Sequence, residues 1–223
     1  MSNDKLASQL GYCFQDERLL RQALTHRSYG TPHNERLEFL GDAALNCAIA
    51  ALLYKRFPNL PEGNLSRLRA SLVNQETLSR IAIDLGLGSR LLLGEGELKS
   101  GGFRRPSILA DGLEAVFGAA FLDGGFQAAA QIIERLYEPL LTSLDPKTQG
   151  KDAKTLLQEF LQGRRLPLPH YRVIDVQGEA HEQHFRVECV IDDLAVTTHG
   201  EGASRRAAEQ NAAREAYELV RKT

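Results

Sequence analysis

Five carboxylates at helical spacing carry the clearest chemical signal in the sequence. Glu35, Glu38 and Asp42 stand at positions i, i+3 and i+7, so a helix would place all three on one face. Asp111 and Glu114 stand at i and i+3 in a second apolar segment. Like charges one turn apart in partly buried helices raise one another's pKa values and destabilise the fold unless cations neutralise them. The pattern therefore favours a metal site.

Each acidic pair taken alone has a second interpretation. Acids at a helix N-terminus are stabilised by the helix dipole, and Asn34 or Ser107 could serve as the N-cap. This interpretation weakens for the whole set, because Asp42 lies two turns inside its segment and Glu114 is embedded among apolar residues. No histidine follows the glutamates at the spacing that di-iron carboxylate bundles use. An all-oxygen set suits Mg²⁺, with Mn²⁺ as a substitute, because both ions keep waters and bind phosphate.

The elements that must position these acids are expected to be helices. Apolar residues recur at helical spacing, between Gly- and Pro-rich turns, over Leu6–Leu10, Leu19–Leu24, Arg36–Tyr54, Leu65–Leu85, Ile108–Leu122 and Ala128–Leu144. We therefore expect an all-α domain over residues 1–144. The two acidic helices are apolar nearly all round, which predicts that they are buried. The polar residues 145–152 predict a linker.

The periodicity changes after the linker. It predicts a first helix, three strands with a turn at Asp192-Asp193, and a closing helix, over Lys154–Gln162, Tyr171–Val176, Phe185–Ile191, Leu194–Thr198 and Arg205–Val220. Residues 153–223 thus form a second domain with the order α-β-β-β-α. The expected fold class is an all-α domain followed by a small α+β domain.

Composition and charge limit the class of protein. The 223 residues include 27 basic and 29 acidic side chains, so a polyanion would bind through clustered cations or bound metal ions rather than through bulk attraction. Cys13, Cys47 and Cys189 form no C-x-x-C pair and are expected to be buried thiols in a reducing cytosol. No uninterrupted apolar run approaches the roughly 20 residues that span a bilayer, and the N-terminus lacks an apolar signal. We expect a cytoplasmic protein with no membrane partner.

The acidic segments resemble those of bacterial ribonuclease III, the double-stranded-RNA endonuclease. The stretch from Asn34 to Asp42 resembles the family signature, Asp111-x-x-Glu114 resembles its second acidic motif, and Ala23–Ser28 and Gly94–Arg105 are similar to flanking segments. The resemblance covers essentially the whole chain. It implies a Mg²⁺-dependent enzyme that hydrolyses phosphodiester bonds in both strands of duplex RNA and leaves 5′-phosphate and 3′-hydroxyl ends with short 3′ overhangs. It also implies processing of ribosomal, messenger and transfer RNA precursors.

Residue by residue, the resemblance implies roles for the acids. Glu38, Asp111 and Glu114 would be the metal ligands, and Asp42 and Glu114 would lie closest to the chemistry. Glu35 would be a supporting acid that orients cationic partners across a homodimer.

Three further features keep two interpretations each. Glu62 matches an accessory acid near the metal, although such an acid is otherwise a solvated loop residue. Phe39 matches an apolar side chain that enters a pocket of the partner in the homodimer, and it could equally be a core aromatic. The segment Glu95–Pro106 is either a mobile loop or a cationic lid.

The main alternative function is that of a non-catalytic duplex-RNA-binding protein with a degenerate nuclease domain. This alternative predicts the loss of Asp42, Asp111 or Glu114, and all three are present.

The C-terminal module resembles a double-stranded-RNA-binding domain. Duplex RNA is recognised through phosphates and 2′-hydroxyls, and the matching polar and basic positions here are Gln158, Gln162, His181, Ser204, Arg205 and Arg206. Ser204 is the expected N-cap of the last helix, whose first turn would dock phosphates. Glu209 replaces the third basic residue of that motif, which predicts a lower or more salt-sensitive affinity for RNA.

Overall fold

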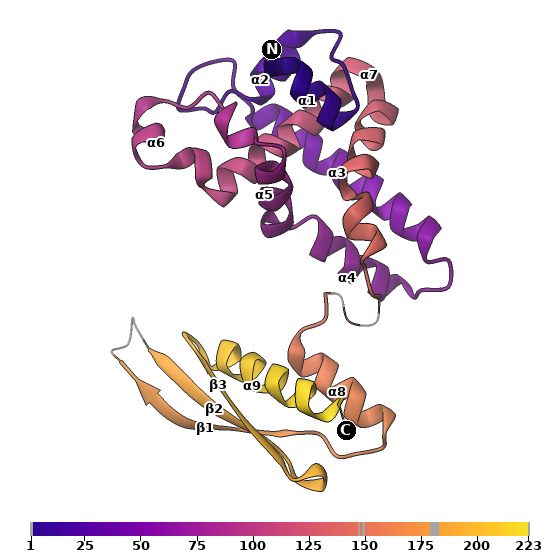
Figure 1. Cartoon of the computed structure of the whole chain (residues 1–223), viewed down its shortest axis with the longest axis vertical. Helices are drawn as coiled ribbons and strands as arrows, with labels where there is room; N and C mark the ends of the chain where they lie inside the picture. Colours follow the sequence, from indigo (N-terminus) through magenta and orange to yellow (C-terminus); the bar gives the residue numbers. More distant parts are fainter. Residues whose placement is uncertain (1, 147, 149, 179–182, 223) are drawn as a thin grey trace. The chain divides into compact units, whose positions relative to one another are not determined.

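The computed structural model describes residues 2–146, 148, 150–178 and 183–222, and it divides into two compact units, Met1–Gln149 and Gly150–Thr223 (Figure 1). The described helices of the first unit are α1 (Ser2–Leu10), α2 (Glu17–Ala23), α3 (Glu35–Arg56), α4 (Glu62–Leu72), α5 (Gln75–Asp84), α6 (Glu95–Lys99) and α7 (Pro106–Thr142), with short 3-10 turns η1 (Leu87–Ser89) and η2 (Gly102–Arg104). The second unit has the order α8 (Ala153–Gly163), β1 (His170–Gln177), β2 (His184–Ile191), β3 (Val196–Gly202) and α9 (Arg205–Val220), with a 3-10 turn η3 (Asp192–Leu194) before β3. The predicted fold class is confirmed.

Helices α3 and α7 pack with their backbones in direct contact. A Cβ atom on Gly41 would collide with the carbonyl oxygen of Glu114, and one on Gly118 would collide with the carbonyl oxygen of Leu37. The pairing of 41 with 114 and of 37 with 118 means that the two helices run antiparallel here. The acidic residues of α3 therefore face those of α7 across the closest approach in the core.

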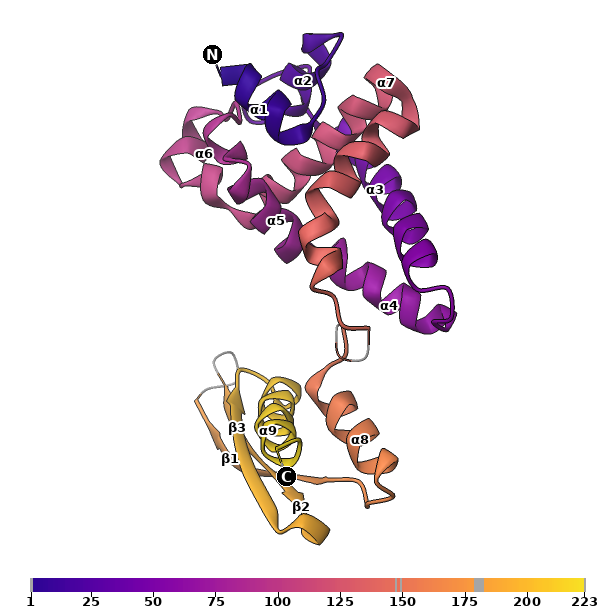
Figure 2. The same ribbon diagram turned by 45° about the vertical axis from the view of Figure 1, so that its right-hand side comes forward.

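A glycine reverses the direction of α7. Gly125 has φ 76° and ψ 178°, a conformation that L side chains rarely adopt, and it separates the helix into two halves. The second half turns back along α3 in both views (Figures 1 and 2). Asp123 anchors this turn by accepting from Tyr12 Oη at 2.7 Å and from the backbone amide of Gln15 at 2.8 Å.

Two predictions about the helices need correction. The expected continuous helix Leu65–Leu85 is two helices. Helix α4 ends at Leu72, and Asn74 caps α5 by accepting from the Thr77 amide at 2.8 Å. The segment Glu95–Pro106, expected to be a mobile loop or a cationic lid, contains α6 and η2, and the lid stays a prediction.

The expectation that α3 is buried on all sides is wrong. Apolar side chains spaced four residues apart, and three at the last step, form an exposed apolar stripe on α3. Its residues are Phe39, Ala43, Cys47, Ala51 and Tyr54. Phe39 is 81% exposed and Tyr54 is 73% exposed. Cys13 is exposed as well, so of the three thiols expected to be buried only Cys189 is. Apolar composition alone does not say whether a face is covered within one chain.

Helices α3 and α7 are long and apolar enough, by length and composition, to cross a membrane. Counting only uninterrupted apolar runs missed this property. Both helices carry the candidate site acids, and their packing against each other forms the core of the first unit. Core helices of soluble proteins pass the same test, so the absence of a membrane span stays a prediction.

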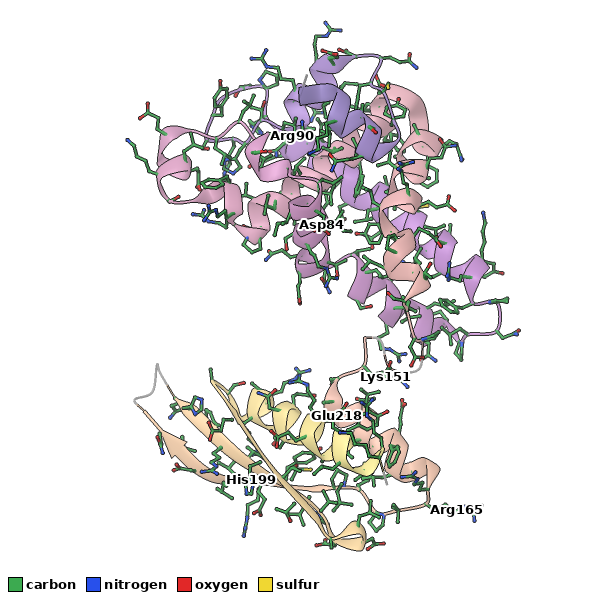
Figure 3. All side chains as sticks on the ribbon, in the orientation of Figure 1. Asp84, Arg90, Lys151, Arg165, His199 and Glu218 are labelled. Carbon is green, nitrogen blue, oxygen red and sulfur yellow. The ribbon has the colours of Figure 1, made fainter. Side chains whose placement is uncertain are left out.

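The second unit is an antiparallel sheet in the order β1-β2-β3, with α8 and α9 on one face (Figures 1 and 2). The third strand begins at Val196, two residues later than predicted, because η3 and the left-handed Ala195 occupy the start of the run. Glu188 of β2 pairs with Arg172 of β1 at 2.9 Å and lies 3.6 Å from His199 of β3. His199 is labelled on the second unit in Figure 3.

The close approach of α3 and α7 predicts a strong effect of one methyl group. We expect Gly41→Ala to lower the free energy of unfolding by about 1–3 kcal/mol, because the added Cβ overpacks a backbone contact. Gly63→Ala in α4 is the matched control, since its Cβ would meet nothing within 4 Å. It should leave stability unchanged or raise it by up to about 1 kcal/mol. Equal midpoints of chemical denaturation for the two variants would contradict the packing.

Candidate metal centre and RNA-binding surface

Three carboxylates from two helices converge in the first unit. Glu38 of α3 and Asp111 and Glu114 of α7 each offer an oxygen, and these oxygens lie within 4.8 Å of one another. All three side chains are partly buried. Glu38 lies in the first turn of α3, whereas Asp111 and Glu114 lie beyond the first turn of α7. The helix dipole therefore does not account for the pair on α7.

Crowding and burial oppose ionisation of this acidic trio, Glu38, Asp111 and Glu114. Burial and then the negative charges of Asp42, Asp111 and Glu38 raise the pKa of Glu114 to about 8. Burial and then the charge of Asp111 raise the pKa of Glu38, and burial raises the pKa of Asp111. A cation bound between the oxygens would relieve both effects. Carboxylate oxygens without nitrogen or sulfur donors suit a hard divalent ion, so the site is consistent with a divalent metal ion.

Asp42 lies one turn after Glu38 on α3, at the edge of the acidic trio. Its side chain is exposed, and Oδ1 accepts from Asn46 Nδ2 at 2.9 Å. It is not one of the three residues with converging oxygens, but its charge acts on Glu114. Asp42 thus borders the centre from the solvent side.

A polar pocket of about 430 Å³ opens beside the acidic trio and mixes acids with cations. Its lining includes Glu38 and Asp111 together with two arginines that already have carboxylate partners. Arg27 Nη1 lies 3.2 Å from Glu35 Oε1, and Arg105 Nη1 lies 3.0 Å from Glu97 Oε2. The sequence predicts no role for Arg27 beyond a segment that flanks the acidic motif, because a His-Arg pair in a turn has no helical or strand periodicity that marks it.

Three predicted site residues do not belong to the trio. Glu62 is exposed in the first turn of α4, where its Oε1 accepts from Ser66 Oγ at 2.7 Å. Phe39 points out of α3 into solvent instead of into the core of its own chain. Glu35 has a partner within its own chain in Arg27, so it does not need another subunit to be paired.

The candidate RNA-binding residues of the second unit lie on its helices. Gln158 and Gln162 are exposed one turn apart on α8, and Arg205 and Arg206 are exposed in the first turn of α9. The predicted N-cap is confirmed, since Ser204 Oγ accepts from the Ala207 amide at 3.2 Å. His181 falls outside the described residues.

Glu209 links α8 to α9 through two ion pairs, and its side chain is largely buried. It accepts from Lys154 Nζ of α8 at 2.7 Å and from Arg205 Nε of α9 at 2.8 Å, and its side chain is only 12% exposed. Burial raises its pKa, but the hydrogen bonds from Lys154 and Arg205 lower it more, so the pKa lies below its ordinary value. The carboxylate thus neutralises part of the cationic end of α9.

Comparisons with known proteins agree with both units. Residues 16–140 match the family described as ribonuclease-III-like, and residues 153–220 match the double-stranded RNA binding motif. The chain is 63% identical over 212 residues to ribonuclease 3 of Thiobacillus denitrificans, covering 95% of this chain and 94% of that protein. It is 59% identical to ribonuclease 3 of Dechloromonas aromatica, covering 97% of each.

A solved structure agrees with the helical unit. The nuclease domain of ribonuclease III from Campylobacter jejuni is 45% identical, with a TM-score of 0.61, and the match covers 64% of this chain and 97% of that one. The fold and the acidic trio define a nuclease domain joined to a duplex-RNA-binding domain. The chain belongs to the ribonuclease III family, as the resemblance predicted.

The raised pKa of Glu114 predicts a pH-dependent cost of folding. Between the ordinary value of 4.5 and about 8, the folded state binds a proton that the unfolded state has lost. The free energy of unfolding should therefore fall as pH rises through this window in EDTA. Glu114→Gln should remove that slope and be the more stable protein at pH 8. Each kcal/mol should raise the melting temperature by about 2–4 °C.

In Mn²⁺, the wild type should instead be more stable than Glu114→Gln. A divalent ion that binds the folded wild type stabilises it by mass action, whereas the amide of Glu114→Gln cannot supply a charged ligand. Suppose instead that, in EDTA, Glu114→Gln melts at or below the wild-type temperature at every pH between 4.5 and about 8. Ionisation of Glu114 then does not destabilise the folded state, and the prediction is wrong.

Proposed function

We propose that Glu38, Asp111 and Glu114 hold Mg²⁺ and, with Asp42, form the active site of an endoribonuclease that cuts double-stranded RNA. The observation that carries this assignment is the convergence of three carboxylate oxygens within 4.8 Å in a chain that also has a duplex-RNA-binding domain. Mn²⁺ fits the same oxygen donors and is the expected substitute.

The residues of the site have different roles in hydrolysis. A bound divalent ion supplies a more acidic water and offsets negative charge on the phosphate. Glu38, Asp111 and Glu114 bind that ion and keep it between α3 and α7. Asp42 stands at the solvent side with Oδ1 held by Asn46, so Oδ2 orients the attacking water and accepts its proton. Glu35 and Glu62 act as supporting acids. The products are 5′-phosphate and 3′-hydroxyl ends with short 3′ overhangs.

Arginines beside the acidic trio would receive the RNA backbone. Arg27 and Arg105 line the polar pocket next to Glu38 and Asp111. When a phosphate enters the pocket, its oxygens would replace the carboxylates that now pair with these two arginines. The acids Glu35 and Glu97 keep these cations in place while no RNA is bound.

A second copy of the chain would cover the exposed apolar stripe on α3. An exposed Phe39 at the start of an apolar helix face is unfavourable in water, and burial in a partner removes that cost. For the Campylobacter jejuni nuclease domain, a region involved in dimer formation has been described. A homodimer has two acidic centres, one for each strand of the duplex. We place the enzyme in the cytoplasm, where precursors of ribosomal, messenger and transfer RNA are its expected substrates.

The second unit would hold the duplex. Gln158 and Gln162 on α8 reach 2′-hydroxyls in a minor groove, and the N-terminus of α9 with Ser204, Arg205 and Arg206 receives phosphates. His181 is proposed as a further groove contact. Because Glu209 binds Arg205 through Nε only, the terminal nitrogens of that arginine stay available to phosphate oxygens.

Cleavage tests the acidic centre. Wild type incubated with long duplex RNA should cut it with Mg²⁺ or Mn²⁺ and not with EDTA. Glu114→Gln should lose cleavage by at least about 10²-fold while binding RNA with nearly wild-type affinity, since it removes a metal ligand and no RNA contact. Glu134→Gln, an exposed acid on the same helix, is the control and should cut normally. Binding without cleavage by the wild type under every metal condition would leave only the binding-module alternative.

Salt dependence tests the second unit. Arg205→Ala/Arg206→Ala should weaken binding of duplex RNA and lower the slope of log affinity against log salt by about 2, one for each lost phosphate contact. Arg221→Ala is the control, because it removes one positive charge at the other end of α9. It should leave the salt slope unchanged. Equal slopes for all three proteins would remove the N-terminus of α9 from the RNA surface.

A further inference from the structure

His26 is a residue of the polar pocket to which the proposed reaction gives no role. It lines that pocket together with Glu38 and Asp111, and its side chain is partly buried. Burial raises the pKa of Asp111, and a positive charge on His26 would oppose this effect more strongly than Arg27 does. The imidazole ring therefore borders the acidic trio from a segment outside α3 and α7.

The turn that carries His26 is held by a second segment of the chain. The His26 amide donates to the Leu92 carbonyl at 3.0 Å, and the Leu92 amide donates to the Leu24 carbonyl at 2.8 Å. The Gly94 amide donates to Ser28 Oγ at 3.0 Å, and a Cβ atom on Gly94 would collide with the Ser28 carbonyl oxygen. The ring thus stands on a fixed backbone, as a preorganised donor requires.

Two hydrogen bonds determine which ring nitrogen of His26 carries the proton. The Ser28 backbone amide, which can only donate, lies 3.2 Å from His26 Nδ1. Ser28 Oγ lies 2.8 Å from the same nitrogen, and since this oxygen already accepts from the Gly94 amide, its O–H is free to donate to Nδ1. Nδ1 is therefore an acceptor, and the neutral ring carries its proton on Nε2.

The Nε2–H group of His26 is a donor that the described part of the chain leaves without a partner. The atom is not among the fully buried polar atoms that lack a hydrogen bond, so solvent reaches it. A nitrogen that carries a proton has no lone pair for a metal ion, which agrees with a converging metal group of Glu38, Asp111 and Glu114 alone among the described residues. The ring is thus a donor beside the metal centre and not a ligand of it.

We propose that His26 Nε2–H donates to a non-bridging oxygen of the phosphate that is cleaved. The inference rests on the proposed function, since the acidic trio must hold the metal that binds the same phosphate. A neutral donor suits this place, because it stabilises the negative charge that develops on the phosphate and does not repel the metal ion as a cation would. The cations of the pocket, Arg27 and Arg105, already pair with carboxylates.

Two substitutions separate this role from a structural one. In His26→Asn, Oδ1 stands near the place of Nδ1 and can accept from the Ser28 amide as in an Asx-turn, but no donor reaches the place of Nε2. In His26→Gln, the amide nitrogen reaches the place of Nε2 and can donate, but the contact with Ser28 is lost. A donor to phosphate requires the Gln variant to be the more active of the two, whereas a ring that only holds the turn requires the Asn variant to be.

The measurement is the single-turnover rate at which the full-length protein cuts duplex RNA, with protein and Mn²⁺ both saturating. His26→Asn should cut about 10²-fold more slowly than wild type, and His26→Gln should stay within about tenfold of wild type. Both variants should bind Mn²⁺ with wild-type affinity, measured by electron paramagnetic resonance without RNA. Their affinity for duplex RNA in EDTA should also be that of wild type, because the second unit supplies most of the RNA contacts.

A rate for His26→Asn that equals or exceeds that of His26→Gln would overturn the inference. Loss of Mn²⁺ binding or of folding in His26→Asn would overturn it as well, because the ring would then hold the structure and not the phosphate. The proposed function would survive each of these results if wild type still binds Mn²⁺ and cuts RNA. A wild type that does not cut duplex RNA with any divalent ion would overturn both.

Discussion

The burial of three neighbouring carboxylates, together with their mutual repulsion, is the constraint on which the structure of the first unit depends. Desolvation and neighbouring charges both favour the protonated form of Glu114 and raise its pKa to about 8. A soluble fold gains nothing in stability from such a cluster. A divalent ion turns the same arrangement into a favourable one, because it supplies charge where water has been removed. The acidic trio therefore lowers stability in the metal-free state, and its oxygens are consistent with a site for a divalent ion.

The backbone geometry serves this arrangement. Gly41 and Gly118 let α3 and α7 touch, which brings carboxylates from two helices within reach of one ion. The reversal at Gly125 then returns the second half of α7 along α3. Glycines thus fix the site through the backbone, whereas the acids supply its chemistry.

The sequence predicted much of this, for identifiable reasons. Spacing of i and i+3 placed Asp111 and Glu114 on one face, and the change from helical to alternating periodicity separated the two domains. Asn74 was not recognised as a cap, because its signal is a single residue inside a run of apolar ones. Exposure of Phe39 was not predictable from one chain, since an apolar face looks the same whether its own core or a partner covers it.

The most direct test of the account is anomalous scattering from a crystal of the full-length protein soaked in Mn²⁺. The account predicts a peak between the carboxylates of Glu38, Asp111 and Glu114, within about 2.0–2.4 Å of their nearest oxygens. An empty centre at saturating Mn²⁺, with these acids ionised and the protein folded, would contradict it.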